Sequence, residues 1–412
     1  MQFSTTIYSR LKARLKRKYK SNFIKVSKAF KNHPSASTAT WIKTHQSEFA
    51  EFHPKKWFYL KQLESLLFFI SQPAQESDED EFSPQDDAIF EKWNNSEFAD
   101  VFLKFLNKRM PLRKASLETA KIFDEHLVSL GKIHLLKIAD SSKHYRIQGS
   151  LGDIRSKQKV SKLLETTLHL DGKELVLLTS SLTEMKDFSS RIEVAARLIK
   201  RFSPDSWVRF CAFTEVIIPI KNEEFVSYSH QELPGTSMIN FYHRDFIDLL
   251  DDLLHENGHH HLNYYLNLED LIEEPIDCIY YSPWRRTLRP LRGIYHAYFT
   301  FFWAFKLFSD LVSAKELDSE FHRFTETEKE KMLWRAVEEY WMLEYTFVDL
   351  QWARKKGLIS DLGWDLIKEQ RSQMTKAKLK VQGWEKKLKT HKKDLQDLKK
   401  VLLKSRKQFI KD

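Results

Sequence analysis

The run His255-Glu-Asn-Gly-His259 is the part of this sequence with the clearest chemical potential. Residues four apart lie on one face of an α-helix, so both imidazoles can reach one ion that is about 2.1 Å from each donor nitrogen. Glu256 lies about 100° around such a helix, where it can contact a bound water or orient a ligand. The spacing therefore predicts a catalytic metal site on a helix.

The surroundings of this run favour a metal site over a chance match. With 16 His among 412 residues, a His-Glu-x-x-His match arises by chance in roughly one chain in twenty. Neighbouring leucines predict a largely buried helix, in which unpartnered histidines would be costly. Gly258 costs about 1 kcal/mol relative to Ala in a helix, which a close approach at that face would explain. His260 and His261 lie off the His255/His259 face and are interpreted as structural or as residues that contact the metal ligands.

Two histidines hold a catalytic ion poorly, so a third protein ligand is expected. In a zinc peptidase of the thermolysin kind it would be a downstream carboxylate, and Glu273, Glu274 and Asp277 are available. The other candidate is His296, thirty-seven residues beyond His259 in the aromatic segment GIYHAYFTFFWAF. The spacing alone leaves both possibilities open.

A second block of sequence lies beside the histidines. The segments LPG, HENGH and SPWRRTLRPLRGIYHAYFTFFW, between about Leu233 and Trp303, resemble the HExxH-type 2-oxoglutarate-dependent peptide β-hydroxylases. That family is associated with modification of ribosomally made peptides. The block with Pro-Trp-Arg, Arg-Pro, Gly and His at fixed distances is much rarer by chance than HExxH alone.

The resemblance implies an Fe(II) ion held by His255, His259 and His296, with 2-oxoglutarate and O₂ as cosubstrates. Arg285 or Arg289 would bind the distal carboxylate of 2-oxoglutarate. An aromatic wall would exclude water from the reaction, formed by Tyr295, Phe299 and Trp303. The alternative for the two arginines is a surface ion pair with the acidic run at 269–274.

Three functions follow as hypotheses. The first is an iron and 2-oxoglutarate dependent oxygenase that hydroxylates the β-carbon of a side chain in a peptide or protein. The second is a zinc metallopeptidase, in which Glu256 is the general base and Glu274 or Asp277 the third ligand. The third is a scaffold whose basic ends bind an anionic polymer and whose histidines are structural.

The charge is concentrated at the two ends of the chain. Residues 1–47 carry +11 and residues 386–412 carry +8, which leaves −9 on the rest of a chain with net charge +10. The ends are expected either to contact nucleic acid, an anionic membrane or an acidic partner, or to form solvated helix faces. Only Cys211 and Cys278 are present and no apolar stretch reaches about 18 residues, so a cytoplasmic protein without a transmembrane segment is expected.

The patterning predicts an α+β fold dominated by helices, with a small sheet before the metal-binding helix. Strands are expected within 131–140, 207–220, 225–229 and 237–242, and a hairpin at Asp171-Gly172. The expected segments are a basic helical region (1–75), an acidic linker (76–87), a catalytic domain (88–355) and a basic C-terminal helix (356–412). Apolar residues seven apart in the last segment predict a long, coiled-coil-like helix that packs on a partner helix in this chain or another; they are Ile367, Met374, Val381, Leu388, Leu395, Leu402 and Phe409.

Overall fold

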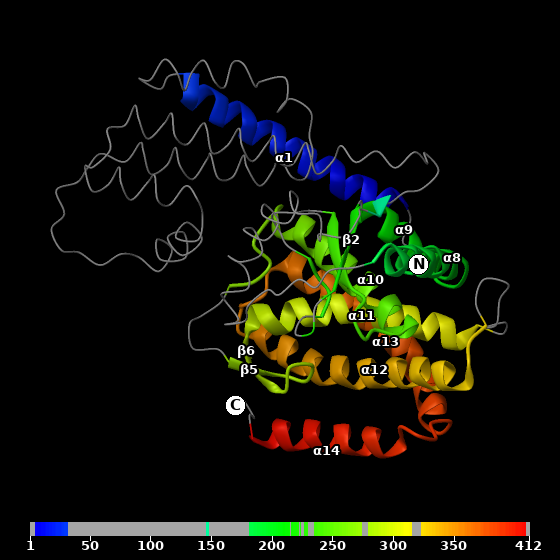
Figure 1. Ribbon diagram of the computed structural model, residues 1–412. Helices are drawn as coiled ribbons and strands as arrows, with labels where there is room; N and C mark the ends of the chain where they lie inside the picture. Colours follow the sequence, from blue (N-terminus) through cyan, green and yellow to red (C-terminus); the bar gives the residue numbers. More distant parts are fainter. Residues whose placement is uncertain are drawn as a thin grey trace, which may run out of the picture. The chain divides into compact units, whose positions relative to one another are not determined.

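The computed structural model describes residues 5–31, 146–147, 181–214, 216–221, 223, 226–229, 235–273, 279–314 and 323–408. The expected acidic linker, the strand within 131–140 and the hairpin at Asp171-Gly172 lie outside these ranges. None of the described helices is long and apolar enough to cross a membrane. The predicted α+β class with dominant helices is confirmed (Figure 1).

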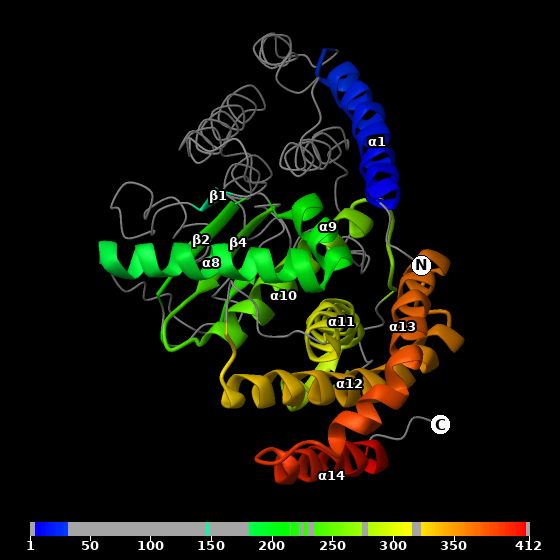
Figure 2. The same ribbon diagram turned by 90° about the vertical axis from the view of Figure 1, so that its right-hand side faces the viewer.

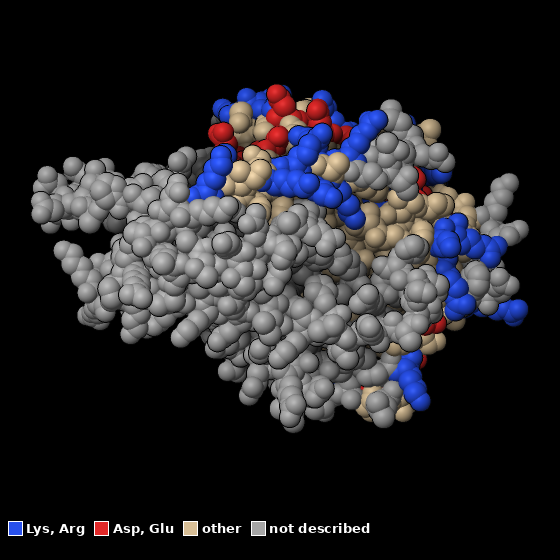
Figure 3. Space-filling model, turned by 90° about the horizontal axis from the view of Figure 1, so that it is seen from above, with Lys and Arg blue, Asp and Glu red and all other residues tan. Residues whose placement is uncertain are grey.

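The chain divides into two compact units that cut across the segments expected from the sequence. The first contains Met1–Lys12, Ser142–Ser150 and Leu177–Asp412, and the second contains Ala13–Ser141 and Leu151–Val176. The first helix, α1 (Thr5–Lys31), contributes to both units and has many lysines and arginines but no acidic residue. Lysine and arginine side chains gather in patches on the described surface (Figure 3).

A four-stranded sheet in the first unit precedes the HENGH helix, as the sequence predicts. Its order is β1-β2-β4-β3, formed by β1 (Arg146–Ile147), β2 (Val216–Ile220), β4 (Thr236–Asn240) and β3 (Tyr228–Ser229). β2 is parallel to β1 and β4, whereas β3 is antiparallel to β4. Two helices come before β2 along the chain, α8 (Leu182–Phe202) and α9 (Pro204–Phe213).

The strand expected at 207–220 is therefore wrong over its first half, which forms α9. Pro204 occupies the first turn of this helix, where a missing N–H costs nothing. The apolar residues after it predict a buried strand, because the periodicity of a short apolar run does not distinguish a buried strand from a buried helix. The pair Ser203-Pro204 is typical of a helix start and could have identified α9 from the sequence.

The HENGH run lies in α10 (Phe246–Leu266), which packs against the sheet and against two long helices. Asp245 and Asp248 form a capping box at its start, with the Asp248 N–H donating to the Asp245 carboxylate over 2.9 Å. α11 (Leu291–Ser313) lies between α10 and α12 (Glu326–Lys355), and Figure 2 shows it end-on in this position. α10 is thus buried on nearly all sides.

The C-terminal segment consists of two helices and not the single long helix expected. α13 (Asp361–Glu385) and α14 (Lys392–Gln408) are separated by a turn. The break has a tertiary cause, because the Glu330 carboxylate of α12 accepts the N–H groups of Lys389 and Thr390, and His391 stacks on Trp334. The heptad positions from Ile367 to Leu402 are buried and pack within this chain, where α12 contacts both helices.

A tight contact between backbones gives a test of the α13 packing. A Cβ atom on Gly363 would be 2.5 Å from the carbonyl oxygen of Leu271, whereas one on Gly383 of the same helix would meet nothing within 4 Å. We expect Gly363→Ala to destabilise the protein by about 1–3 kcal/mol and Gly383→Ala to stabilise it by about 0.5–1 kcal/mol. Urea denaturation followed by circular dichroism measures both. Equal effects of the two variants would contradict this packing.

Candidate metal centre

His255 and His259 have the spacing of two ligands of one ion. Their Nε2 atoms are 3.2 Å apart and their ring centroids 4.9 Å apart. Two nitrogens that each lie about 2.1 Å from an ion and about 100° apart would be separated by about 3.2 Å. The pair is therefore arranged to bind a metal ion through Nε2, as one face of a helix allows.

His296 of α11 is the third histidine that the fold brings to this place. Its ring centroid is 6.2 Å from that of His259, and its buried Nε2 has no hydrogen-bond partner in the described part of the chain. Three imidazoles around one ion have ring centroids about 5 Å apart, so the His296 ring is about 1 Å further from His259 than a shared ion requires. As they stand, the described residues include no group of three or more His, Cys, Asp or Glu side chains that is close enough to hold an ion.

The two helices reach this proximity because of Gly258. A Cβ atom there would be 3.2 Å from the Cα of Thr300 on α11. The close approach inferred from the sequence is thus a contact of α10 with α11. Since Thr300 is one turn after His296 and Gly258 directly precedes His259, this contact sets the two histidines against each other.

Burial keeps these imidazoles neutral. Desolvation lowers the pKa of His255 to about 3, with smaller contributions from the charges of Arg335 and Arg285. It lowers the pKa of His296 to about 3 and that of His259 well below its usual value. Neutral imidazole is the form that binds a metal ion, so the site is in its ligating state over the whole physiological pH range.

Glu256 is buried close to Ser229 and Tyr228 of β3. It is 3% exposed, and burial raises the pKa of its carboxyl group to about 8, while the Ser229 hydroxyl opposes this shift. Burial raises the pKa of Tyr228, and the nearby Glu256 adds to this shift. The carboxyl group thus lies among the side chains of the sheet.

The carboxylates considered as third ligands lie elsewhere or outside the described residues. Glu273 is exposed and its backbone N–H donates to the carbonyl oxygen of Leu358, which fixes the segment beside α13. Glu274 and Asp277 belong to the part of the chain that the structure does not describe.

The block SPWRRTLRP forms a β-hairpin, which the sequence analysis does not predict. Its strands are β5 (Ile279–Ser282) and β6 (Thr287–Pro290), joined by the loop 283–286. Arg285 and Arg289 are exposed, and neither forms an ion pair with a carboxylate of the described residues. Arg285 lies near enough to the histidine pair to lower the pKa of both rings.

Trp284 and Phe301 are the aromatic side chains beside the pair, and sequence reasoning missed both. The Trp284 ring stacks on Phe301 at 4.7 Å, and Phe301 contacts His255 with ring centroids 4.2 Å apart. Trp284 is fixed by its Nε1–H, which donates to the buried Glu339 over 2.8 Å. The Pro-Trp-Arg element could have indicated an anchored tryptophan, because a buried indole needs an acceptor.

The expected aromatic wall is buried but lies around a different histidine. Phe299 and Trp303 pack against His261, and the Tyr295 hydroxyl donates to the carbonyl oxygen of Gly363. Phe299 and Trp303 lie within about 60° of His296 around α11 but about one and two turns further along the helix, where they meet His261. Their prediction as a wall of the metal site is not supported by their positions.

His260 and His261 have structural surroundings. The Gly235 N–H donates to His260 Nδ1 over 3.3 Å, and His260 Nε2 is 3.2 Å from the Ser237 hydroxyl, so this ring joins α10 to the sheet. His261 is stacked on Phe213 at 4.5 Å and neither of its nitrogens has a hydrogen-bond partner among the described residues. Nearby, the buried Arg209 lies 3.8 Å over the Trp303 ring.

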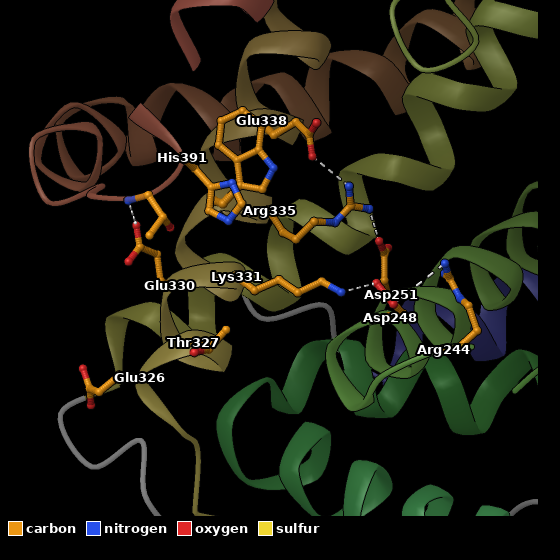
Figure 4. A pocket seen from close by; sticks show the side chains of 12 residues that line it. Arg244, Asp248, Asp251, Glu326, Thr327, Glu330, Lys331, Arg335, Glu338 and His391 are labelled. Carbon is orange, nitrogen blue, oxygen red and sulfur yellow. Dashed lines mark hydrogen bonds and ion pairs between the residues drawn. The ribbon is translucent and has the colours of Figure 1, made fainter. Parts of the chain in front are cut away.

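A charged cleft of about 520 Å³ opens beside the N-terminal halves of α10 and α12. Figure 4 shows Lys331 and Arg335 reaching from α12 toward Asp248 and Asp251 of α10. Arg335 also pairs with Glu339, the acceptor of the Trp284 indole. The cleft is therefore lined largely by charges that pair with each other.

Neither a protein-family model nor a curated protein matches this chain. The site is accordingly interpreted from its own geometry.

The metal site is tested by removing single ligands. We expect His255→Ala and His259→Ala each to abolish stoichiometric iron binding and to leave the helical content unchanged, because packing already holds α10 in place. His261→Phe is the matched control and should retain iron. Metal analysis after anaerobic reconstitution, with circular dichroism in parallel, measures both properties. Full occupancy in either alanine variant would refute the assignment.

The buried His261 predicts a specific loss of stability in acid. Burial lowers its pKa well below the usual value, so below about pH 6.5 the unfolded chain binds a proton that the folded protein excludes. Stability is therefore lost as the pH falls, and His261→Phe should remove this loss. Its stability relative to the wild type should be about 2 kcal/mol greater at pH 5 than at pH 7.5. Urea denaturation of chelator-treated protein at both pH values measures it, and a pH-independent difference would be evidence against neutral burial.

Proposed function

We propose that this protein is an Fe(II) and 2-oxoglutarate dependent oxygenase that hydroxylates the β-carbon of a side chain in a peptide or protein. The observation that carries the proposal is the set of three neutral histidines on two crossing helices, His255, His259 and His296, with the exposed Arg285 beside them. Since only two cysteines are present, we place the protein in a reducing compartment such as the cytoplasm.

The donor set fits a divalent transition metal. Imidazole nitrogens suit iron as well as zinc, and the unpartnered Nε2 of His296 is a buried donor that an ion would satisfy. When bound, Fe(II) with 2-oxoglutarate oxidises a C–H bond with O₂ and releases succinate and CO₂. His255 and His259 would orient the ion, and His296 would complete the set from α11.

The remaining groups have roles in binding and in exclusion of water. Arg285 or Arg289 would hold the distal carboxylate of 2-oxoglutarate, since a guanidinium can donate two parallel hydrogen bonds to a carboxylate. Phe301 and the Trp284 ring stacked on it cover His255 and keep bulk water from that side.

A zinc metallopeptidase is the second candidate, and the contacts of Glu256 weigh against it. A general base must face the metal-bound water, whereas the neighbours that influence the pKa of Glu256 include Ser229 of β3. The third ligand of a peptidase would be a carboxylate, and the described candidate, Glu273, is exposed after α10. His296 is the group that the described fold places next to His259.

The two enzymes assign opposite importance to two residues. A peptidase needs Glu256 as a base, so Glu256→Gln would lower its rate by about 10²- to 10⁴-fold. In the oxygenase, we expect His296→Ala to eliminate succinate formation from 2-oxoglutarate and Glu256→Gln to retain part of it. Succinate release under Fe(II) and O₂ is measured together with the metal content of each protein. A His296→Ala protein that keeps its iron and turnover would overturn the ligand assignment, and peptide cleavage with zinc but no consumption of 2-oxoglutarate would favour the peptidase.

A further inference from the structure

The β5–β6 hairpin presents a dense group of positive charges beside the histidines. Residues 285–290 are all exposed, and within eight residues the chain has four arginines, Arg285, Arg286, Arg289 and Arg292. No acidic residue occurs between positions 278 and 309. All four residues of β6 are exposed, whereas β5 is buried and its Tyr280 is 1% exposed.

Three of these arginines differ from several others of the same unit. Arg244, Arg335, Arg371 and Arg406 each pair with a carboxylate. Arg285, Arg286 and Arg289 have no ion-pair partner within the ranges that the structure describes. An exposed group of like charges without counter-charges repels itself and attracts anions. The local sequence therefore maintains a positive surface at this place.

The group borders the metal centre on two sides. Trp284, in the loop between the strands, is linked to His255 through the stack on Phe301. Arg292 is one helical turn before His296, on the same face of α11. An anionic molecule bound to the hairpin would therefore extend directly to the three histidines.

Arg286 occupies a backbone conformation that arginine disfavours. It ends the four-residue loop of the hairpin with φ +51°, in the left-handed region where glycine or asparagine is usual. A side chain in this region strains the chain, and such strain is concentrated at functional sites. Since glycine would stabilise the turn, we infer that the Arg286 side chain has a role other than stabilising the fold.

We propose that the β5–β6 hairpin and Arg292 form the docking surface for an acidic segment of the peptide or protein substrate. This inference rests on the proposed function and names the class of its substrate. The cosubstrate has one distal carboxylate, which one arginine can bind, so the remaining guanidinium groups exceed its need. Leu288 is 41% exposed among the arginines and offers an apolar contact that a peptide side chain can use. The phosphate backbone of a nucleic acid would gain no binding free energy from this apolar contact.

The test measures binding without turnover, so that it stays separate from the metal chemistry. A fluorescently labelled twelve-residue peptide with four Glu separated by Gly and Ser is titrated with the full chain in EDTA, beside the same peptide with Gln for Glu. We expect the wild type to bind the Glu peptide about 10-fold more tightly or better. Equal affinities would overturn the proposal.

Substitutions of Arg286 separate its charge from its backbone strain. Arg286→Gln and Arg286→Gly should both weaken binding of the Glu peptide by about 3- to 10-fold, while Arg286→Lys retains most of it. Only Arg286→Gly should raise the melting midpoint, by about 1–3 °C. Arg323→Gln removes another exposed arginine of the same unit and should change the affinity less than about 2-fold. Equal losses in Arg286→Gln and Arg323→Gln would show general attraction and overturn the proposal.

Two other anions serve as competing occupants in the same assay. They are a twelve-nucleotide single-stranded RNA and vesicles of phosphatidylcholine with phosphatidylserine. Tighter binding of either than of the Glu peptide, lost in Arg286→Gln, would overturn the peptide assignment. Peptide docking in a protein that forms no succinate would refute the proposed function alone, and succinate formation without selective docking would refute this inference alone.

Discussion

The contact between α10 and α11 at Gly258 and Thr300 is the constraint on which the candidate site depends. With the helix backbones this close, His259 and His296 face each other across the crossing. A β-carbon at position 258 would push Thr300 away, because packed helices have no empty space to take it up. The helix crossing therefore determines the geometry of the candidate metal site, although neither Gly258 nor Thr300 is a proposed ligand. It also explains a glycine in the middle of a long, well-capped helix.

Because α10 is buried on nearly all sides, each of its polar groups needs a partner, and most have one. The partners come from every neighbouring element: the Asp252 carboxylate accepts from the Ser227 hydroxyl, the Asn257 amide donates to Thr214, and His260 bonds to the sheet. Several buried polar atoms have no partner among the described residues, and of these the Nε2 of His296 lies next to the His255/His259 pair. Unsatisfied buried donors and acceptors cost stability, so an ion bound by this nitrogen is a physical explanation for its retention.

The sequence predicted those features that depend on local periodicity. The His255/His259 spacing is a property of any helix, and the apolar seam from Ile367 to Leu402 is buried as its seven-residue period requires. What failed depends on contacts between distant segments. Nothing near position 390 marks a helix end; the carboxylate of Glu330, on another helix, creates it. Likewise, the stack of Trp284 on Phe301 depends on how the hairpin folds back on α11, which no local pattern encodes.

The position of His296 beside His259 has an energetic meaning. In the absence of an ion, three buried neutral imidazoles share one small region, and their nitrogens cannot all find hydrogen-bond partners there. An ion bound by all three would satisfy the Nε2 of His296 and link α10 to α11 at the crossing. Binding to the folded chain alone stabilises it by an amount that grows with the logarithm of the free metal concentration. Metal affinity and the α10–α11 contact are therefore coupled, and a substitution that loosens the crossing at Gly258 weakens metal binding without touching a ligand.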